Sequence, residues 1–152
     1  MPPAGAKPGE GIVSREQRDM SKPWFDGLEI GAVSVKWVRR TGDGRTAAAE
    51  FARHGGNPER TVREIFERYS AGECESIVVT GQTARGLLEL PYRSETECLE
   101  KALSFLQIKP DMLLSLGGET FSVYPLRDGM IKNVISTSKC AAGTGEFIIQ
   151  PF

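Results

Sequence analysis

The stretch Gly27–Lys36, with the sequence GLEIGAVSVK, decides the fold. Two segments that begin in it, Gly27–Gly31 and Val33–Val38, have the composition of β-strands. The second alternates apolar and polar side chains regularly, which is typical of a half-buried strand. A glycine, Gly31, stands between them, where a tight turn favours a residue without a side chain. The stretch therefore predicts two strands joined by a turn, at the start of a sheet.

The residues that follow extend this sheet and add a helix. The sequence Thr41–Gly44, TGDG, predicts a hairpin turn, and a third strand is expected at about 46–53. Asn57 followed by Pro58 is typical of a helix N-cap and first helical residue. Apolar side chains then recur at helical spacing: Val62, Ile65, Phe66 and Tyr69. The β-branched run Ser76–Gly81 predicts a buried strand.

A second helix completes this first unit, and a second set of strands follows it. Ser94 and Glu97 match a capping box, which predicts a helix to about Gln107. Three further strands are expected, at about 112–116, 120–126 and 130–136. The turn between the last two is predicted at Arg127–Gly129. Because both halves open as strand, glycine turn, strand, turn, strand and helix, the sequence predicts a duplicated α/β architecture.

The predicted fold class is α/β, with a mixed sheet built in the order β-β-β-α-β-α. Residues 1–22 are rich in Pro and Gly and then polar, so we expect a flexible leader. Residues 23–108 are predicted to form a first lobe, and 109–152 to begin a second. The last predicted helix stops at Pro151–Phe152 soon after it starts, which predicts that the second lobe is incomplete in this chain.

Composition narrows the function. The chain has 152 residues and a net charge of −1, which gives no basic surface for nucleic acid or membranes. It has no apolar run of the about 18–20 residues that span a membrane, and no secretory signal. We therefore expect a cytoplasmic protein without a nucleic-acid or membrane partner. The three cysteines, an odd number without a CxxC pair, disfavour a disulfide framework.

Two glycine-containing turns are candidates for binding phosphate. One follows Glu29 and includes Gly31; the other contains Gly117 and Gly118. A carboxylate at a strand end can hold Mg²⁺, and backbone N–H groups of a glycine turn can approach phosphate oxygens. Each turn alone is more often structural. Their repetition indicates two hairpins that face each other across a nucleotide cleft.

For the remaining candidate residues, the sequence gives weaker evidence of a function. Cys140 precedes small residues at a predicted helix start, and Cys98 lies in the first turns of another helix, where the helix dipole favours a thiolate. Two structural cysteines are the alternative. We expect no role for Cys74 and no catalytic role for His54, which has no partner in a recognisable motif. Thr80, Gly81 and Arg85 either border a cleft or form a plain connection, and no motif identifies a catalytic residue.

Five segments occur in the order found in the BadF-type ATPases, the activators of 2-hydroxyacyl-CoA dehydratases. They are GLEIGAVSVK (27–36), VVTGQTARG (78–86), SETECLEKA (94–102), LSLGGETF (114–121) and KCAAGTGEF (139–147). The chain resembles this family over roughly residues 26–150. The resemblance implies the actin/Hsp70/sugar-kinase superfold, a ribonuclease-H-like architecture in which two similar lobes hold ATP with Mg²⁺ between them.

The resemblance also implies roles for individual residues. The nucleotide-binding positions are Glu29, Gly31, Ser34, Lys36, Gly117, Gly118, Gly143, Thr144 and Gly145. Cys98 and Cys140 match the cysteines implied to ligate one [4Fe–4S] cluster shared by two chains of a homodimer. The implied activity is ATP-dependent transfer of a low-potential electron to a 2-hydroxyacyl-CoA dehydratase or benzoyl-CoA-reductase-like partner.

Two departures from the family keep other functions open. Glu29 and Ser115 stand where the family has Asp, and phosphoryl transfer depends on such charges. The alternative is a non-catalytic, dimerising iron–sulfur or scaffold module that has lost ATPase activity. A small-molecule kinase of the same superfold is a third interpretation, but it does not explain the pair Cys98 and Cys140.

Overall fold

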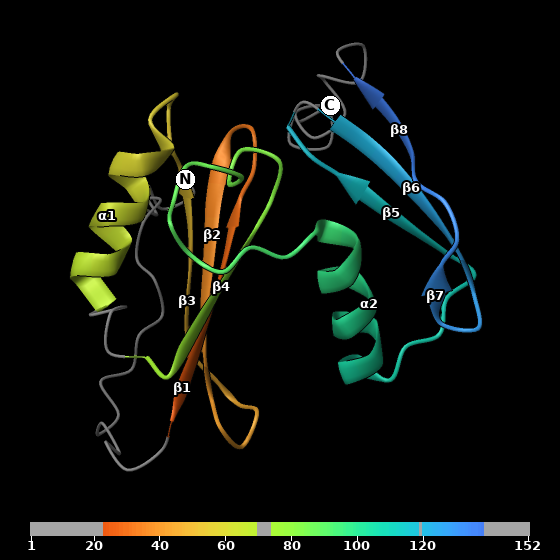
Figure 1. Cartoon of the computed structure of the whole chain (residues 1–152), viewed down its shortest axis with the longest axis horizontal. Helices are drawn as coiled ribbons and strands as arrows, with labels where there is room; N and C mark the ends of the chain where they lie inside the picture. The colour runs from red at the N-terminus through yellow and green to blue at the C-terminus, as the bar shows by residue number, and fades with distance from the viewer. Residues whose placement is uncertain (1–22, 70–73, 119, 139–152) are drawn as a thin grey trace, which may run out of the picture.

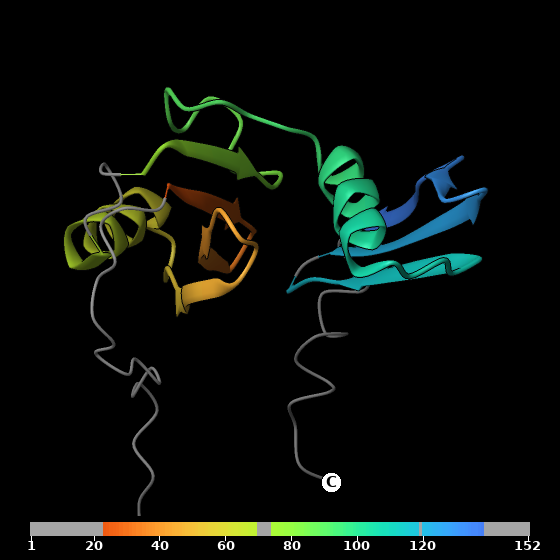
Figure 2. The ribbon, with the colours of Figure 1, turned by 90° about the horizontal axis from the view of Figure 1, so that it is seen from below.

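The computed structural model of the chain describes residues 23–69, 74–118 and 120–138. The predicted leader and the predicted last helix lie outside these residues. Two sheets lie side by side, with helix α2 between them, as Figures 1 and 2 show from two directions. No helix in the described ranges is long and apolar enough to cross a membrane.

The first sheet has four strands in the order β3-β2-β1-β4. Their bounds are Trp24–Ile30 for β1, Ser34–Thr41 for β2, Thr46–Arg53 for β3 and Ser76–Thr80 for β4. The three hairpin-connected strands are antiparallel, whereas β4 pairs parallel to β1. This parallel pairing needs a crossover connection, which contains helix α1, Pro58–Tyr69. The predicted mixed sheet is confirmed.

The core lies between this sheet and α1. Alternate side chains of the strands point toward the helix, and these meet the apolar stripe of α1. The buried members are Leu28, Ile30, Val35, Trp37, Val62, Ile65, Val79 and Ala84. Fully burying one such aliphatic side chain stabilises a fold by about 1.5–3 kcal/mol, so this cluster fixes the register of β1 and β2.

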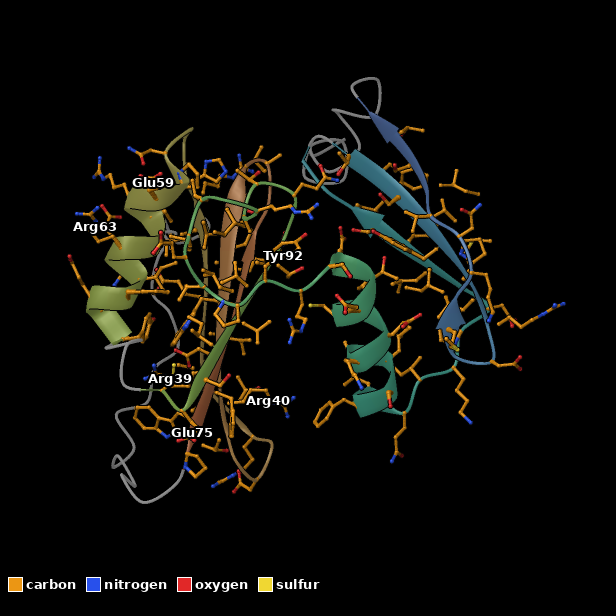
Figure 3. The ribbon with its side chains drawn as sticks, in the orientation of Figure 1. Arg39, Arg40, Glu59, Arg63, Glu75 and Tyr92 are labelled. Atoms are coloured by element: carbon orange, nitrogen blue, oxygen red, sulfur yellow. The ribbon has the colours of Figure 1, made fainter. Side chains whose placement is uncertain are left out.

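A buried ion pair interrupts the apolar face. Arg39 donates through two nitrogens to the two carboxylate oxygens of Asp26, each at 2.8 Å. It also donates to the carbonyl of Tyr69 at the end of α1, at 2.9 Å. Its guanidinium lies over the rings of Trp24 and Trp37 (Figure 3). Because both charges have partners, the pair is tolerated in the core, and loss of either partner leaves a buried charge uncompensated.

The second sheet is antiparallel and has β6 at its centre. Its strands are Met112–Leu116 (β5), Thr120–Arg127 (β6), Met130–Ile131 (β7) and Ile135–Ser138 (β8). Both β7 and β8 pair with the same edge of β6. Asp128 and Gly129 form a tight turn with φ of 57° and 75°. Positive φ at both positions is the requirement of a type I′ hairpin turn, so the predicted turn is confirmed.

The predicted single strand at 130–136 is wrong. The pairing with β6 shifts by one residue between Leu126↔Ile131 and Val123↔Ile135. Pro125 lies between these pairs and has no N–H to donate to a neighbouring strand, although its carbonyl accepts from the Lys132 N–H at 3.0 Å. The ladder is therefore interrupted opposite the proline, and two short strands replace one.

Helix α2, Glu95–Leu106, begins at the predicted capping box. The Ser94 hydroxyl accepts from the Glu97 N–H, and the Glu97 carboxylate accepts from the Ser94 N–H at 2.9 Å. The helix is tied to the second sheet, where the Glu100 carboxylate accepts from the Ile131 N–H at 2.7 Å. The lobe boundary after residue 108 stays a prediction, but the hydrogen bond between Glu100 and Ile131 joins α2 to β7.

Candidate functional site

The two glycine turns have the same geometry. In the first, the Gly31 N–H donates to the Ser34 carbonyl at 2.9 Å; in the second, the Gly117 N–H donates to the Thr120 carbonyl at 2.8 Å. Corresponding residues of the two turns are 86 positions apart, and the strands that flank them pair with the same offset. The two hairpins are therefore structural repeats of each other.

These turns touch. A Cβ atom built on Gly118 lies 2.5 Å from a methyl carbon of Val33, closer than such atoms can approach. Gly118 thus lets the tip of the second turn pack on the tip of the first, as only a residue without a side chain can. The structure brings the two predicted phosphate turns together at one edge of the molecule.

An ion pair lies beside the first turn. Lys36 Nζ and Glu29 Oε2 are 2.5 Å apart, on residues directly opposite in β1 and β2. A Cβ on Gly31 would lie 3.0 Å from Glu29 Oε1, so the carboxylate also reaches the turn. The lysine side chain is 57% exposed and the glutamate side chain 32% exposed. One anionic and one cationic group are therefore accessible at this turn, suited to Mg²⁺ and phosphate respectively.

The end of β4 closes the same edge. Thr80 lies opposite Glu29 in the parallel pairing, and its buried Oγ1 has no hydrogen-bond partner among the described residues. Gly81 follows with φ of 105°, and a Cβ there would lie 2.3 Å from the Ile30 carbonyl oxygen. The guanidinium of Arg85, the third residue considered for this edge, lies over the ring of Tyr92 at 5.9 Å.

Ser115 has a carboxylate partner from another element. Its hydroxyl donates to Glu95 Oε1 at 3.3 Å, in the first turn of α2. Tyr124 lies nearby on β6 and is 2% exposed. Burial raises the pKa of its hydroxyl, and the negative charge of Glu95 raises that pKa further. The Ser115 side chain is thus hydrogen-bonded to α2.

A groove of about 710 Å³ separates α2 from the first sheet. Charged and polar side chains line it from both sides: Glu29, Lys36, Arg40, Thr80, Cys98 and Lys101. Arg40 bridges it, with its guanidinium 4.0 Å from the ring centre of Phe105 on α2 (Figure 3). The half-buried Cys98 borders this groove.

The structure assembles part of the predicted site. It brings together six predicted residues: Glu29, Gly31, Ser34, Lys36, Gly117 and Gly118. The others, Cys140, Gly143, Thr144 and Gly145, lie outside the described residues. Cys98 lies apart from the turns, on α2. For Cys74, burial raises the pKa of the thiol and the nearby Asp26 carboxylate raises it further.

His54, for which no catalytic role is expected from the sequence, contacts the first turn. Its ring Nε2 lies 3.2 Å from the carbonyl oxygen of Gly31. The signal for it was a lone histidine between a predicted strand and Gly55–Gly56. That pattern alone does not predict the contact with Gly31, because the two residues are far apart in the sequence.

The described residues, with their paired turns, have an actin-like ATPase fold, which they share with two solved structures. The activator of the 2-hydroxyisocaproyl-CoA dehydratase from Clostridium difficile, with bound ADPNP, matches with a TM-score of 0.68 and 24% identity. The match covers 82% of this chain and 49% of that one. Component A of the (R)-2-hydroxyglutaryl-CoA dehydratase of Acidaminococcus fermentans matches with a TM-score of 0.67 and 22% identity, over 84% of this chain and 52% of that one.

Sequence comparison leads to the same proteins. The activator of lactoyl-CoA dehydratase of Anaerotignum propionicum is 31% identical over 130 residues, 80% of this chain and 50% of the relative. The 2-hydroxyisocaproyl-CoA dehydratase activator of Clostridioides difficile is 26% identical over 129 residues, 80% of this chain and 48% of the relative. No family model matches. The chain is a relative of the 2-hydroxyacyl-CoA dehydratase activators and spans about half of their length.

Proposed function

We propose that the chain is the N-terminal part of an ATP-dependent iron–sulfur activator. It passes a low-potential electron to a 2-hydroxyacyl-CoA dehydratase or benzoyl-CoA-reductase-like partner in the cytoplasm. One observation carries the proposal: two glycine turns of equal geometry meet at Val33 and Gly118, in a chain related to such activators. Paired turns of this kind offer backbone N–H groups to a phosphate chain from two sides.

The charged residues complete this phosphate site. Glu29 and Lys36 now neutralise each other at 2.5 Å. With Mg·ATP bound, the Glu29 carboxylate would help to hold the cation and the Lys36 ammonium would pair with a phosphate oxygen. The Gly31–Ser34 turn and Gly117–Gly118 hold the phosphates, and the segment Gly143–Gly145 is proposed to join them.

Nucleotide binding tests the site directly. Isothermal titration of the two-lobed protein that contains this chain with Mg·ADPNP should give a Kd that rises about 10–100-fold in Lys36→Ala, because one charge-assisted hydrogen bond is lost. Lys101→Ala is the matched control, since Lys101 lines the same groove away from the turns. Equal affinity in the wild type and Lys36→Ala, or no binding at all, would contradict the nucleotide site.

The cluster part of the proposal rests on cysteines. One chain cannot supply four thiolates to a [4Fe–4S] cluster, so a homodimer with Cys98 and Cys140 from each chain is proposed. Within the described residues, no group of three or more His, Cys, Asp or Glu is arranged to hold a metal ion. These residues contribute one proposed ligand, Cys98, and its thiol borders a groove of its own chain. The two cysteines therefore need separate tests.

Iron and acid-labile sulfide, measured after anaerobic reconstitution, separate these roles. We expect about four irons per dimer, lost in Cys98→Ala and in Cys140→Ala but kept in Cys74→Ala. If Cys98→Ala still binds iron, the Cys98 thiol does not ligate the cluster, and another residue must supply that ligand. A chain that binds no iron would remove the electron-transfer role.

A non-catalytic module is the second candidate. It is favoured by Ser115, which holds no charge at the second turn and is hydrogen-bonded to Glu95. Phosphate release from ATP by the two-lobed protein that contains this chain distinguishes the candidates. Nucleotide binding without phosphate release supports the module, whereas turnover that disappears in Glu29→Gln supports the ATPase.

A further inference from the structure

The only histidine of the chain is placed between the first phosphate turn and helix α1. His54 follows β3, and both nitrogens of its ring have backbone partners. Nδ1 lies 3.1 Å from the Gly56 nitrogen, and Nε2 lies 3.2 Å from the Gly31 carbonyl oxygen. Its own backbone N–H donates to the Val33 carbonyl at 3.2 Å. These three hydrogen bonds connect His54 to the first turn and to the loop before α1.

These contacts fix which nitrogen carries the proton. Nδ1 accepts the N–H of Gly56, so it cannot itself hold a proton. The proton of the neutral ring is then on Nε2, which donates to the carbonyl of Gly31. The assignment follows from the hydrogen-bond partners, both of which are backbone groups of known direction.

The loop that carries the ring is shaped around it. Gly55 and Gly56 have φ of 53° and 89°, and a Cβ on either would meet no atom within 4 Å. Crowding therefore does not explain these glycines, whereas the positive φ that lets the loop fold back to Nδ1 does. The Asn57 N–H then donates to the His54 carbonyl at 2.8 Å, and the Asn57 side chain caps α1.

The contact with Gly31 has a consequence for the turn. A trans peptide is planar, and its C=O and N–H point in opposite directions. When His54 holds the carbonyl of Gly31, it therefore aims the N–H of Ala32 away from the β3–α1 loop. This places one donor of the first turn in a fixed direction before any ligand is bound.

We propose that His54 is a positioning residue for the first phosphate turn: it fixes the Gly31–Ala32 peptide so that the Ala32 N–H is presented to a nucleotide phosphate. This role rests on the proposed nucleotide site, but the hydrogen bond between His54 and Gly31 can be tested without that site. A preset donor requires no reorganisation when the anion arrives, and this strengthens binding.

Two substitutions separate the two ring nitrogens. His54→Asn retains an acceptor where Nδ1 lies, so it keeps the bond from Gly56 but loses the donor to Gly31. His54→Gln is long enough to place an amide N–H where Nε2 lies, so it keeps that donor. In the two-lobed protein that contains this chain, we expect the Kd for Mg·ADPNP to rise about tenfold in His54→Asn and to stay within about threefold of the wild type in His54→Gln.

NMR spectroscopy detects the hydrogen bond between His54 and Gly31 without nucleotide. Because the chain has one histidine, its ring ¹⁵N signals need no assignment, and they should show the proton on Nε2. The Ala32 amide signal should shift in His54→Asn and remain close to the wild type in His54→Gln. A proton on Nδ1, an unmoved Ala32 signal in His54→Asn, or equal effects of both variants would overturn the proposal. If the hydrogen bond between His54 and Gly31 is observed but Mg·ADPNP does not bind, the positioning role fails together with the nucleotide site. The histidine then only holds the loop.

Discussion

Gly81 shows how much of the site depends on one residue. It follows β4 with φ of 105°, and its backbone touches the carbonyl of Ile30, the last residue of β1. The close approach brings Thr80 to the edge where the first turn begins. A side chain at this position would separate β4 from β1 and widen the predicted phosphate site.

Gly81→Ala should therefore destabilise the chain much more than Gly86→Ala. Gly86 also has positive φ, 83°, but open space around it, so alanine there costs only the backbone strain of about 1–2 kcal/mol. At Gly81 the clash with Ile30 adds roughly 1–3 kcal/mol. Urea unfolding of both variants measures the difference. Equal losses in the two would show that β4 moves freely away from β1.

Helix α2 carries its own acid-sensitive element at its start. Hydrogen bonds from the Ser94 hydroxyl and backbone N–H lower the pKa of the Glu97 carboxyl from its ordinary value of 4.5. Since the folded state lowers this pKa, the contribution to stability is present above pH of about 4.5. It disappears as the pH falls through the folded-state value.

The acid dependence of unfolding should therefore be weaker in Glu97→Gln. Glutamine at this position still accepts from the Ser94 N–H but does not titrate. Ser94→Ala should also weaken the acid dependence, and its loss of the N-cap should cost about 1 kcal/mol near neutral pH. Urea unfolding between pH 3 and pH 7 measures both effects. Identical pH profiles for wild type and Glu97→Gln would exclude the capping box as their source.

The two hairpin repeats bury opposite faces. In the first sheet, Leu28 faces α1 and is 2% exposed, whereas the equivalent Leu114 of the second sheet is 54% exposed. The face of the second sheet that α2 covers instead carries Ser122 and Tyr124. Equivalent faces of the two sheets thus both point toward α2 (Figure 2). The outer face of β5, with Met112, Leu114 and Leu116, remains apolar and exposed in the described structure.

This asymmetry predicts that substitutions at the equivalent positions Leu28 and Leu114 have different effects on stability. Leu28→Thr should destabilise the chain by about 2–5 kcal/mol, because it opens a cavity in the core. Leu114→Thr should change stability by less than about 0.5 kcal/mol and reduce self-association, since exposed apolar patches promote contacts between chains. Chemical unfolding and sedimentation velocity measure the two effects. A large loss of stability in Leu114→Thr would mean that this face is covered.

Local chemistry explains what the sequence could predict. The turn at Gly31, the Asn57–Pro58 helix start and the capping box at Ser94 each depend on neighbouring residues, and all three are confirmed. The strand expected at 130–136 was wrong because its interruption depends on Pro125 across the sheet. Pairings between distant residues leave no local pattern.

The same limit holds for the candidate site. The pairing of Glu29 with Lys36 follows from one hairpin and could be expected from the sequence. The contact of His54 with Gly31 and that of Ser115 with Glu95 each join separate elements. Their geometry depends on how α1 and α2 pack, which periodicity alone does not fix.

The contact between Val33 and Gly118 limits how the two halves can move. Because the tips of the turns already touch, the halves cannot slide closer to each other along that edge. A rotation that closes the groove would keep this contact as its fulcrum. Displacement in such a rotation grows with distance from the fulcrum. A small change at the turns would therefore become a larger displacement in the parts of the two halves that lie far from them.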